Sequence, residues 1–271
     1  MQVVEAHGCR IPQIGFGTMT LTGDICVQAV KTALQMGYRH LDTAQMYDNE
    51  CEVGDGVRAS GKRNEVMVTT KVQPTMLAPL DLERSVKESL ARLRLDVIDL
   101  LLIHWPNPRV PLSETLGAMA KMRREGYARA IGVSNFTVAL LDEANKLCSE
   151  PLVCNQVECH PYLDQDKVIA ACRRHGMATV AYSPVARGGV KGDKLLERIG
   201  EVHKKTATQV CLRWLTQQGI AVIPRTSKIE RLQENFTIFD FRLSDTEMKK
   251  IAGLARGGGR LVDWSYSPDW D

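Results

Sequence analysis

Short apolar segments and amphipathic segments alternate along almost the whole sequence. The apolar segments are typical of strands covered on both faces, and the amphipathic ones are typical of helices that pack against a sheet. This alternation restricts the fold to a parallel α/β sheet, either a closed barrel or a doubly wound sheet. We expect eight strands, at Ile14–Gly17, Tyr38–Asp42, Val66–Lys71, Ile98–His104, Ala130–Ser134, Cys154–Glu158, Thr179–Tyr182 and Ile220–Ile223.

The glycine pattern after the first strand separates these two folds. A doubly wound dinucleotide fold carries Gly-x-Gly-x-x-Gly at this point. The nearest match, Gly15–Thr20, lacks the third glycine, and no Walker A pattern is present. We therefore predict one (β/α)8 TIM barrel domain spanning residues 1–271, since about 250 residues are typical of this fold. A capping box at Ser244–Glu247 predicts an extra C-terminal helix, and Gly257–Gly259 opens a tail.

Charge and cysteine usage exclude several functional classes. The chain has 35 basic and 32 acidic residues, with no long run of one sign, which argues against a nucleic-acid or membrane partner. Met1–Arg10 lacks the features of a secretory signal, so we expect a cytoplasmic protein. The eight cysteines form no Cys-x-x-Cys pair, which predicts buried free thiols and no metal site. No association segment is visible, and we expect a monomer.

Polar residues stand at the ends of three neighbouring predicted strands. Asp42 ends the second strand and Tyr47 follows it, Lys71 ends the third, and His104 ends the fourth and precedes Trp105. Active sites of barrels lie at the C-terminal ends of the strands. Each residue alone has an ordinary alternative: a helix cap, rim packing, a solvated lysine or a core histidine. Their joint placement at one rim favours a catalytic site.

Reduction of a carbonyl group suits these residue types. Hydride addition puts negative charge on the carbonyl oxygen, which then needs a proton donor. Tyr47 can donate, but a free tyrosine has a pKa of about 10. We expect Lys71, held by Asp42, to lower that pKa, and His104 to hydrogen-bond and orient the carbonyl group.

Beyond these residues, the chain resembles the aldo-keto reductase superfamily along essentially its whole length. The matching segments are Leu41–Ala44, Tyr47–Glu50, Thr70–Lys71, Leu102–Pro106, Ile131–Phe136, Asn155–Glu158, Tyr182–Pro184 and Ile223–Thr226. The tail segments Gly259–Asp263 and Pro268–Asp271 are most similar to those of short bacterial members, the diketogluconate and methylglyoxal reductases. The resemblance implies NADPH-dependent reduction of small aldehydes or ketones.

The resemblance also implies a role for each site residue. Tyr47 would be the general acid, tuned by Lys71 and Asp42, and His104 would orient the substrate. Residues implied to bind the cofactor are Ser134, Asn135 and Gln156 (nicotinamide carboxamide), Tyr182 (nicotinamide ring), Ser183 (pyrophosphate), Arg225, Thr226 and Arg231 (2′-phosphate), and Glu234 and Asn235 (adenine). Met19 and Trp105 would line the substrate pocket with Tyr47 and His104.

The match with the family has two departures, and some residues have simpler explanations. Many relatives have Lys-Ser where this chain has Arg225-Thr226, but arginine keeps the charge and can bind phosphate with two N–H groups. Many relatives have an aromatic residue in place of Met19. Ser134 and Asn135 could simply cap the next helix, and Arg225 and Arg231 could be ordinary surface charges.

Two other functions remain open at the level of sequence. Lys71 could form a Schiff base in a barrel lyase, which borohydride trapping would reveal. That function would leave Ser134, Asn135, Gln156 and Arg225 unexplained. Alternatively, the chain could be a non-catalytic NADPH-binding subunit, which would bind the cofactor tightly without turnover. The presence of Asp42, Tyr47, Lys71 and His104 together argues against it.

Overall fold

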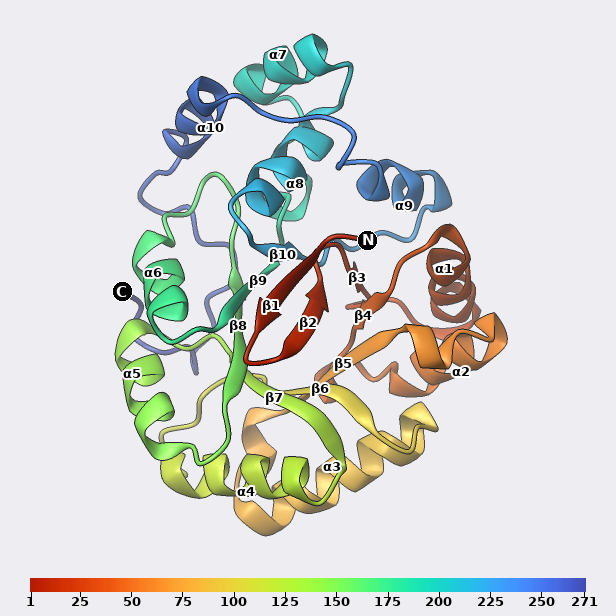
Figure 1. The fold of residues 1–271 in the computed structure, drawn as a ribbon, viewed down its shortest axis with the longest axis vertical. Helices are drawn as coiled ribbons and strands as arrows, with labels where there is room; N and C mark the ends of the chain where they lie inside the picture. Colours follow the sequence, from red (N-terminus) through yellow and green to blue (C-terminus); the bar gives the residue numbers. More distant parts are fainter.

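The computed structural model describes residues 1–271 and confirms the predicted (β/α)8 barrel. Eight parallel strands follow one another in sequence order around the sheet (Figure 1): β3 Phe16–Gly17, β4 His40–Asp42, β5 Met67–Val72, β6 Ile98–Ile103, β7 Ala128–Ser134, β8 Leu152–Glu158, β9 Ala178–Tyr182 and β10 Ala221–Val222. Parallel bridges pair Ile14 with Val222 and Gly17 with Arg225. These bridges connect the first strand to the last and close the barrel.

Helices cover the outside of the sheet, as a parallel sheet requires. They are α1 Gly23–Met36, α2 Glu50–Ser60, α3 Pro79–Leu93, α4 Leu112–Arg124, α5 Val138–Leu147, α6 Asp166–Arg174, α7 Lys194–His203, α8 Ala207–Gln217, α9 Ile229–Phe236 and α10 Asp245–Ala252. The extra C-terminal helix is α10, and the side chains of Ser244 and Glu247 cap it reciprocally. None of these helices has the length and apolar character needed to cross a bilayer.

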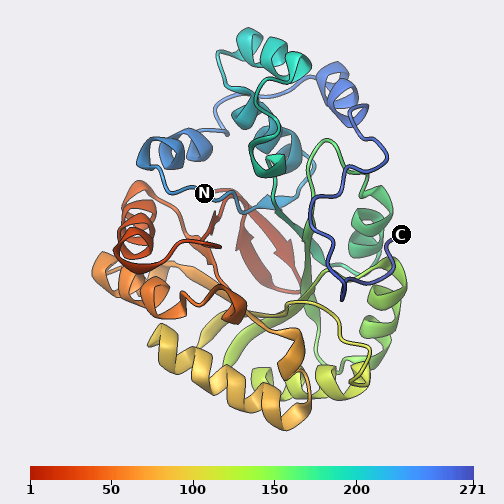
Figure 2. The same ribbon diagram turned by 180° about the vertical axis from the view of Figure 1, so that it is seen from behind.

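A hairpin that the sequence analysis did not predict closes one end of the barrel. Strands β1 (Val3–Ala6) and β2 (Cys9–Pro12) pair antiparallel across a two-residue turn. His7 and Gly8 in this turn have φ values of 47° and 78°, the sign that tight hairpin turns need. Ala6 and Ile11 pack on apolar residues inside the barrel. The hairpin lies in front in Figure 1, so Figure 2 views the opposite end of the barrel.

The interior of the barrel changes from apolar to polar along its axis. Near the hairpin it is filled by aliphatic side chains such as Leu100, Leu102 and Val180. Toward the C-terminal ends of the strands it holds Asp42 and Lys71, which are also buried. All eight cysteines are free thiols, and the five that are buried confirm the sequence prediction for those positions: Cys26, Cys154, Cys159, Cys172 and Cys211. Cys51 is exposed.

Two helical glycines give a matched test of helix packing. A methyl group on Gly54 in α2 would clash with the Leu93 carbonyl oxygen of α3, whereas one on Gly117 in α4 would meet nothing within 4 Å. We expect Gly54→Ala to lower the free energy of unfolding by about 1–3 kcal/mol through overpacking. Gly117→Ala should raise it by about 0.5–1 kcal/mol through helix propensity. Urea denaturation measures both, and equal effects would contradict the close approach of α2 to α3.

Candidate active site

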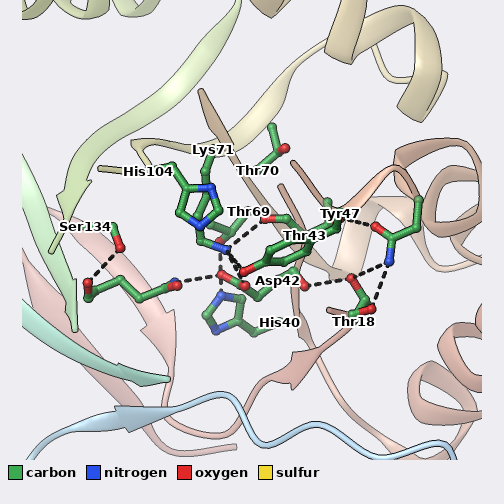
Figure 3. A network of polar contacts seen from close by, with 12 residues as sticks. Thr18, His40, Asp42, Thr43, Tyr47, Thr69, Thr70, Lys71, His104 and Ser134 are labelled. Carbon is green, nitrogen blue, oxygen red and sulfur yellow. Dashed lines mark hydrogen bonds and ion pairs between the residues drawn. The ribbon is translucent and has the colours of Figure 1, made fainter. Parts of the chain in front are cut away.

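A buried lysine stands at the centre of the polar end of the barrel. The ammonium group of Lys71, at the end of β5, donates to Asp42 Oδ1 at 2.5 Å, to the Thr43 carbonyl at 2.9 Å and to the Tyr47 hydroxyl at 3.4 Å (Figure 3). The Lys71 side chain has no exposed surface, and that of Asp42 is only 2 % exposed. The three donors of the ammonium thus have three acceptors, which burial of a charge requires.

Asp42 connects this lysine to the far side of the barrel. Its second oxygen, Oδ2, accepts from Gln156 Nε2 of β8 at 2.7 Å. Strand pairing places Asp42 opposite Thr69, two residues before Lys71 on the neighbouring strand. Because alternate residues of a strand point to the same side, Thr69 and Lys71 share a face of β5 beside Asp42. The register of the barrel therefore sets the contact between the two charges.

Lys71 acts on the pKa of Tyr47 in the expected direction, but burial outweighs it. Burial raises the pKa of Tyr47, and the opposing effect of the Lys71 charge only partly offsets it. Lys71 is closer to Asp42 than to the phenol, so most of its charge is matched by the carboxylate. Nevertheless, the pKa of the Lys71 ammonium is raised: burial lowers it, but Asp42 and Tyr47 outweigh that effect. Both groups are consequently protonated at neutral pH, so the Tyr47 hydroxyl carries a proton that it could donate.

His104 lies beside the phenol, with its ring centroid 5.6 Å from that of Tyr47 and the two rings nearly perpendicular. Burial lowers the pKa of His104 well below its usual range, and the Lys71 charge lowers it further. The imidazole is therefore neutral at physiological pH. Its Nδ1 atom is buried without a hydrogen-bond partner. The four residues predicted as catalytic thus meet at one place, around the Tyr47 hydroxyl.

A second set of predicted residues lies on the adjacent rim, at the ends of β7, β8 and β9. The hydroxyl of Ser134 donates to the Gln156 carbonyl at 2.8 Å, and the amide of Asn135 donates to the His104 carbonyl at 2.9 Å. Tyr182 donates to Asn135 Oδ1 at 2.8 Å. Asn135 adopts a left-handed conformation with a φ of 63°. Its side chain bonds both to His104, after β6, and to Tyr182, at the end of β9. Ser183, which follows Tyr182, also has positive φ.

The remaining predicted cofactor residues lie after β10, outside this network. Arg225 and Arg231 are exposed and form no ion pair with an acidic residue. Arg225 instead holds the loop after β3, donating to the Met19 carbonyl and to Thr20 Oγ1. Thr226 Oγ1 accepts from the Lys228 backbone N–H at 3.0 Å, which stabilises the turn before α9. In α9, Glu234 accepts from Thr206 at 2.6 Å, and Asn235 is buried.

The C-terminal tail crosses the mouth of the barrel, which sequence reasoning did not locate. Figure 2 shows it passing in front of the strands beside α5 and α6. The buried carboxylate of Glu158 accepts from the backbone N–H groups of Leu261 and Val262 at 2.7 and 2.8 Å, and from His160. Glu158 belongs to a segment that the sequence analysis singled out, but its partners are backbone groups that leave no signal in the sequence.

The anchored tail brings aromatic rings onto the predicted substrate residue Trp105. The rings of Tyr266 and Trp270 approach the Trp105 indole edge-on, with centroid distances of 5.5 and 6.1 Å. Trp105 is consequently only 3 % exposed. Tyr266 and the predicted pocket residue Met19 are exposed, at 40 % and 42 %. The tail and the loop after β3 therefore each offer an exposed apolar side chain.

Comparison with known proteins places this architecture in a family. The model of the aldo/keto reductase family matches residues 13–256. The chain belongs to that family. It is 39 % identical to the methylglyoxal reductase DkgB of Escherichia coli O157:H7 over 96 % of this chain and 99 % of the relative, and 42 % identical to the 2,5-diketo-D-gluconic acid reductase B of a Corynebacterium species over 94 % and 92 %. The solved structure of the aldose reductase from Schistosoma japonicum has a TM-score of 0.90 at 32 % identity, covering 95 % of this chain and 94 % of that one.

The contact between Glu158 and the tail gives a prediction that needs no assay of activity. Glu158→Gln leaves one acceptor oxygen and adds an NH₂ group facing N–H donors. An unsatisfied buried donor costs about 1–3 kcal/mol, so the tail should detach more often. Trypsin should then cleave after Arg260 faster than in the unmodified protein, as mass spectrometry of the fragments would show.

Glu247→Gln is the matched control for this experiment. Glu247 likewise accepts from a histidine and from a backbone N–H, but in the cap of α10 rather than in the tail contact. The Glu247→Gln variant should leave cleavage after Arg260 unchanged. Equal cleavage of the two variants at Arg260 would show that Glu158 does not hold the tail.

Proposed function

We propose that the protein is an NADPH-dependent reductase that converts small aldehydes or ketones to alcohols, with Tyr47 as the general acid. The observation that carries this proposal is the phenol of Tyr47 beside the buried ammonium of Lys71. The ammonium donates to the phenol oxygen, which leaves the phenol proton free for a substrate. A lone buried tyrosine would lack this neighbour, which stabilises the negative oxygen left after proton transfer.

Each residue of the centre has one task in the proposed reaction. When bound, the reduced nicotinamide supplies the hydride that adds to the carbonyl carbon. Tyr47 donates its proton to the carbonyl oxygen as negative charge develops there, and Lys71 stabilises the resulting phenolate until solvent returns the proton. Neutral His104 hydrogen-bonds the carbonyl oxygen and orients it, because an uncharged imidazole carries an N–H donor without competing for the proton. Asp42 keeps Lys71 in place.

The residues of the chain fit a nicotinamide dinucleotide with a 2′-phosphate. Ser134, Asn135 and Gln156 present amide and hydroxyl groups at the rim beside Tyr182, which suits a carboxamide and a flat ring. Arg225 and Arg231 are exposed cations without an acidic partner, as a phosphate site requires. We assign Ser183 to the pyrophosphate, Thr226 to the 2′-phosphate, and Glu234 and Asn235 to the adenine.

The state of Lys71 argues against a Schiff-base lyase. Imine formation needs a neutral amine with access to the substrate. Lys71 is buried, all three of its donors are engaged, and its pKa is raised, so the neutral form is scarce. The carbonyl compounds named for the relatives, methylglyoxal and 2,5-diketo-D-gluconic acid, are the first substrates to assay. The monomeric state and cytoplasmic location expected from the sequence remain predictions.

Replacing the proposed proton donor tests the mechanism. Tyr47→Phe should lower kcat by about 10²–10⁴-fold, the usual contribution of a general acid, while NADPH still binds. The measurement is NADPH oxidation with methylglyoxal, together with cofactor binding by quenching of tryptophan fluorescence. Tyr127→Phe is a matched control, because Lys87 lies over that ring at 5.2 Å, away from the barrel mouth. A Tyr47→Phe enzyme with more than about a tenth of the original kcat would refute the assignment.

Replacing both exposed arginines tests the choice of cofactor. A charged hydrogen bond contributes about 1.5–3 kcal/mol, and two of them, partly screened by solvent, correspond to a preference for NADPH of roughly 10²-fold. The Arg225→Ala/Arg231→Ala double variant should therefore lose NADPH affinity far more than NADH affinity. Dissociation constants from fluorescence quenching measure this, with Arg198→Ala on α7 as the control. If both cofactors lose affinity equally, these arginines do not bind the 2′-phosphate.

A further inference from the structure

One cation at the mouth of the barrel has no hydrogen-bond or ion-pair partner in the protein. Arg260, in the tail, is half-buried and forms no hydrogen bond or ion pair with any protein group. Its Nη1 atom is fully enclosed and unpaired. A buried donor without an acceptor is costly, and for a charged group the cost is higher still. An arginine in this state calls for a hydrogen-bond acceptor that the chain itself does not provide.

Contacts on both sides place Arg260 near Tyr182 and Trp105, two residues proposed to bind the cofactor and the substrate. The next residue, Leu261, is bound through its backbone N–H to Glu158, which pairs with Tyr182 across β8 and β9. The centre of the guanidinium lies 3.6 Å from the ring centroid of Trp270, which in turn contacts Trp105. Arg260 thus lies near Tyr182, at the end of β9, and on the ring of Trp270, which contacts Trp105, the residue after His104.

The carboxylates nearest to Arg260 are engaged elsewhere. Glu158 accepts from two backbone N–H groups and from His160. Asp263 accepts from the Trp270 indole at 3.0 Å, and Asp271 accepts from the Val138 backbone N–H at the start of α5. None of the three lies within 4.0 Å of the guanidinium, the limit for an ion pair. They partly balance the charge of Arg260 from a distance but leave its N–H donors free.

We propose that Arg260 is a specificity-determining residue that binds a carboxylate on the carbonyl substrate; this inference rests on the proposed reductase function. A guanidinium placed over an aromatic ring keeps its N–H groups available for hydrogen bonds, and its fork of donors matches the two oxygens of a carboxylate. The surrounding acidic residues offset part of its charge, which favours a singly charged carboxylate over a doubly charged phosphate. The enzyme therefore prefers oxo acids to neutral carbonyl compounds of the same shape.

The test compares two aldehydes that differ in one charge. 4-Carboxybenzaldehyde carries a carboxylate, and its methyl ester, methyl 4-formylbenzoate, is neutral; both suit a mouth with exposed aromatic residues. Arg260→Met keeps the length of the side chain and its contact with Trp270 but removes the charge and the donors. We expect it to lower kcat/KM for the acid by about 10–100-fold, as loss of a charged hydrogen bond implies, and to change that for the ester less than about twofold.

Two further variants separate charge from packing. Arg260→Lys should recover part of the preference for the acid, because it restores the charge but not the fork of donors. Arg256→Met is the matched control, since Arg256 also lies over a tail-contacting ring, that of Tyr162, at 4.9 Å. It should leave both aldehydes unaffected. The NADPH dissociation constant, measured for every variant, should not change.

Each other outcome rejects the proposal in a recognisable way. Equal losses for acid and ester in Arg260→Met would mean that Arg260 only supports the tail. Weaker NADPH binding would mean that it contacts the cofactor. If the variant is inactive, the kinetic comparison is replaced by a binding measurement on the NADP⁺ complex. The ligands are then 4-carboxybenzyl alcohol and its methyl ester. If Arg260→Met changes the dissociation constants of both ligands equally, the proposal is rejected. An unmodified protein that reduces neither aldehyde nor methylglyoxal would refute the reductase function itself, and this inference with it.

Discussion

The buried ion pair of Lys71 and Asp42 is the interaction on which the functional end of the barrel depends. Taking two charges out of water costs several kcal/mol for each ion unless the geometry and the additional hydrogen bonds are good. Here Lys71 has three acceptors, and both Asp42 oxygens accept a hydrogen bond. These partners come from β4, the segment after it, β5 and β8. Only a closed barrel in this register brings them together, so fold and site specify each other.

Much of the fold follows from local sequence patterns, while its exceptions follow from tertiary contacts. The long apolar run Ile98–His104 was predicted as a strand, and β6 ends one residue earlier, at Ile103. Tyr38 was expected to begin a strand, but β4 starts at His40; the Tyr38 side chain lies in the core and its hydroxyl donates to the Leu232 carbonyl of α9. The β1–β2 hairpin was missed because two four-residue strands carry little periodicity, although the glycine of its turn was a visible signal.

The site divides in the same way between local and distant determinants. Asp42, Lys71 and His104 could be placed from sequence because the ends of neighbouring parallel strands meet at one rim. The raised pKa of Tyr47 could not be predicted, since it depends on how completely the phenol is enclosed and on how much of the Lys71 charge Asp42 neutralises. The contact between Glu158 and the tail joins groups more than a hundred residues apart in sequence through backbone donors, which every residue except proline has.

The hydrogen-bond and ion-pair partners that each cation has within the protein agree with the role proposed for it. Lys71 is buried and saturated with acceptors, so it cannot bind a ligand; it acts on the phenol of Tyr47 through its charge. Arg225 and Arg231 are exposed and lack acidic partners, so solvent stabilises them, helped at Arg225 by hydrogen bonds to the loop after β3; their proposed role is to bind the 2′-phosphate. Arg260 is neither saturated nor well solvated, and desolvation lowers the pKa of its guanidinium while Glu158 opposes that change. Of these cations, Arg260 would therefore gain most from an anion brought by the substrate, because the protein pairs none of its N–H donors and burial removes part of their solvation.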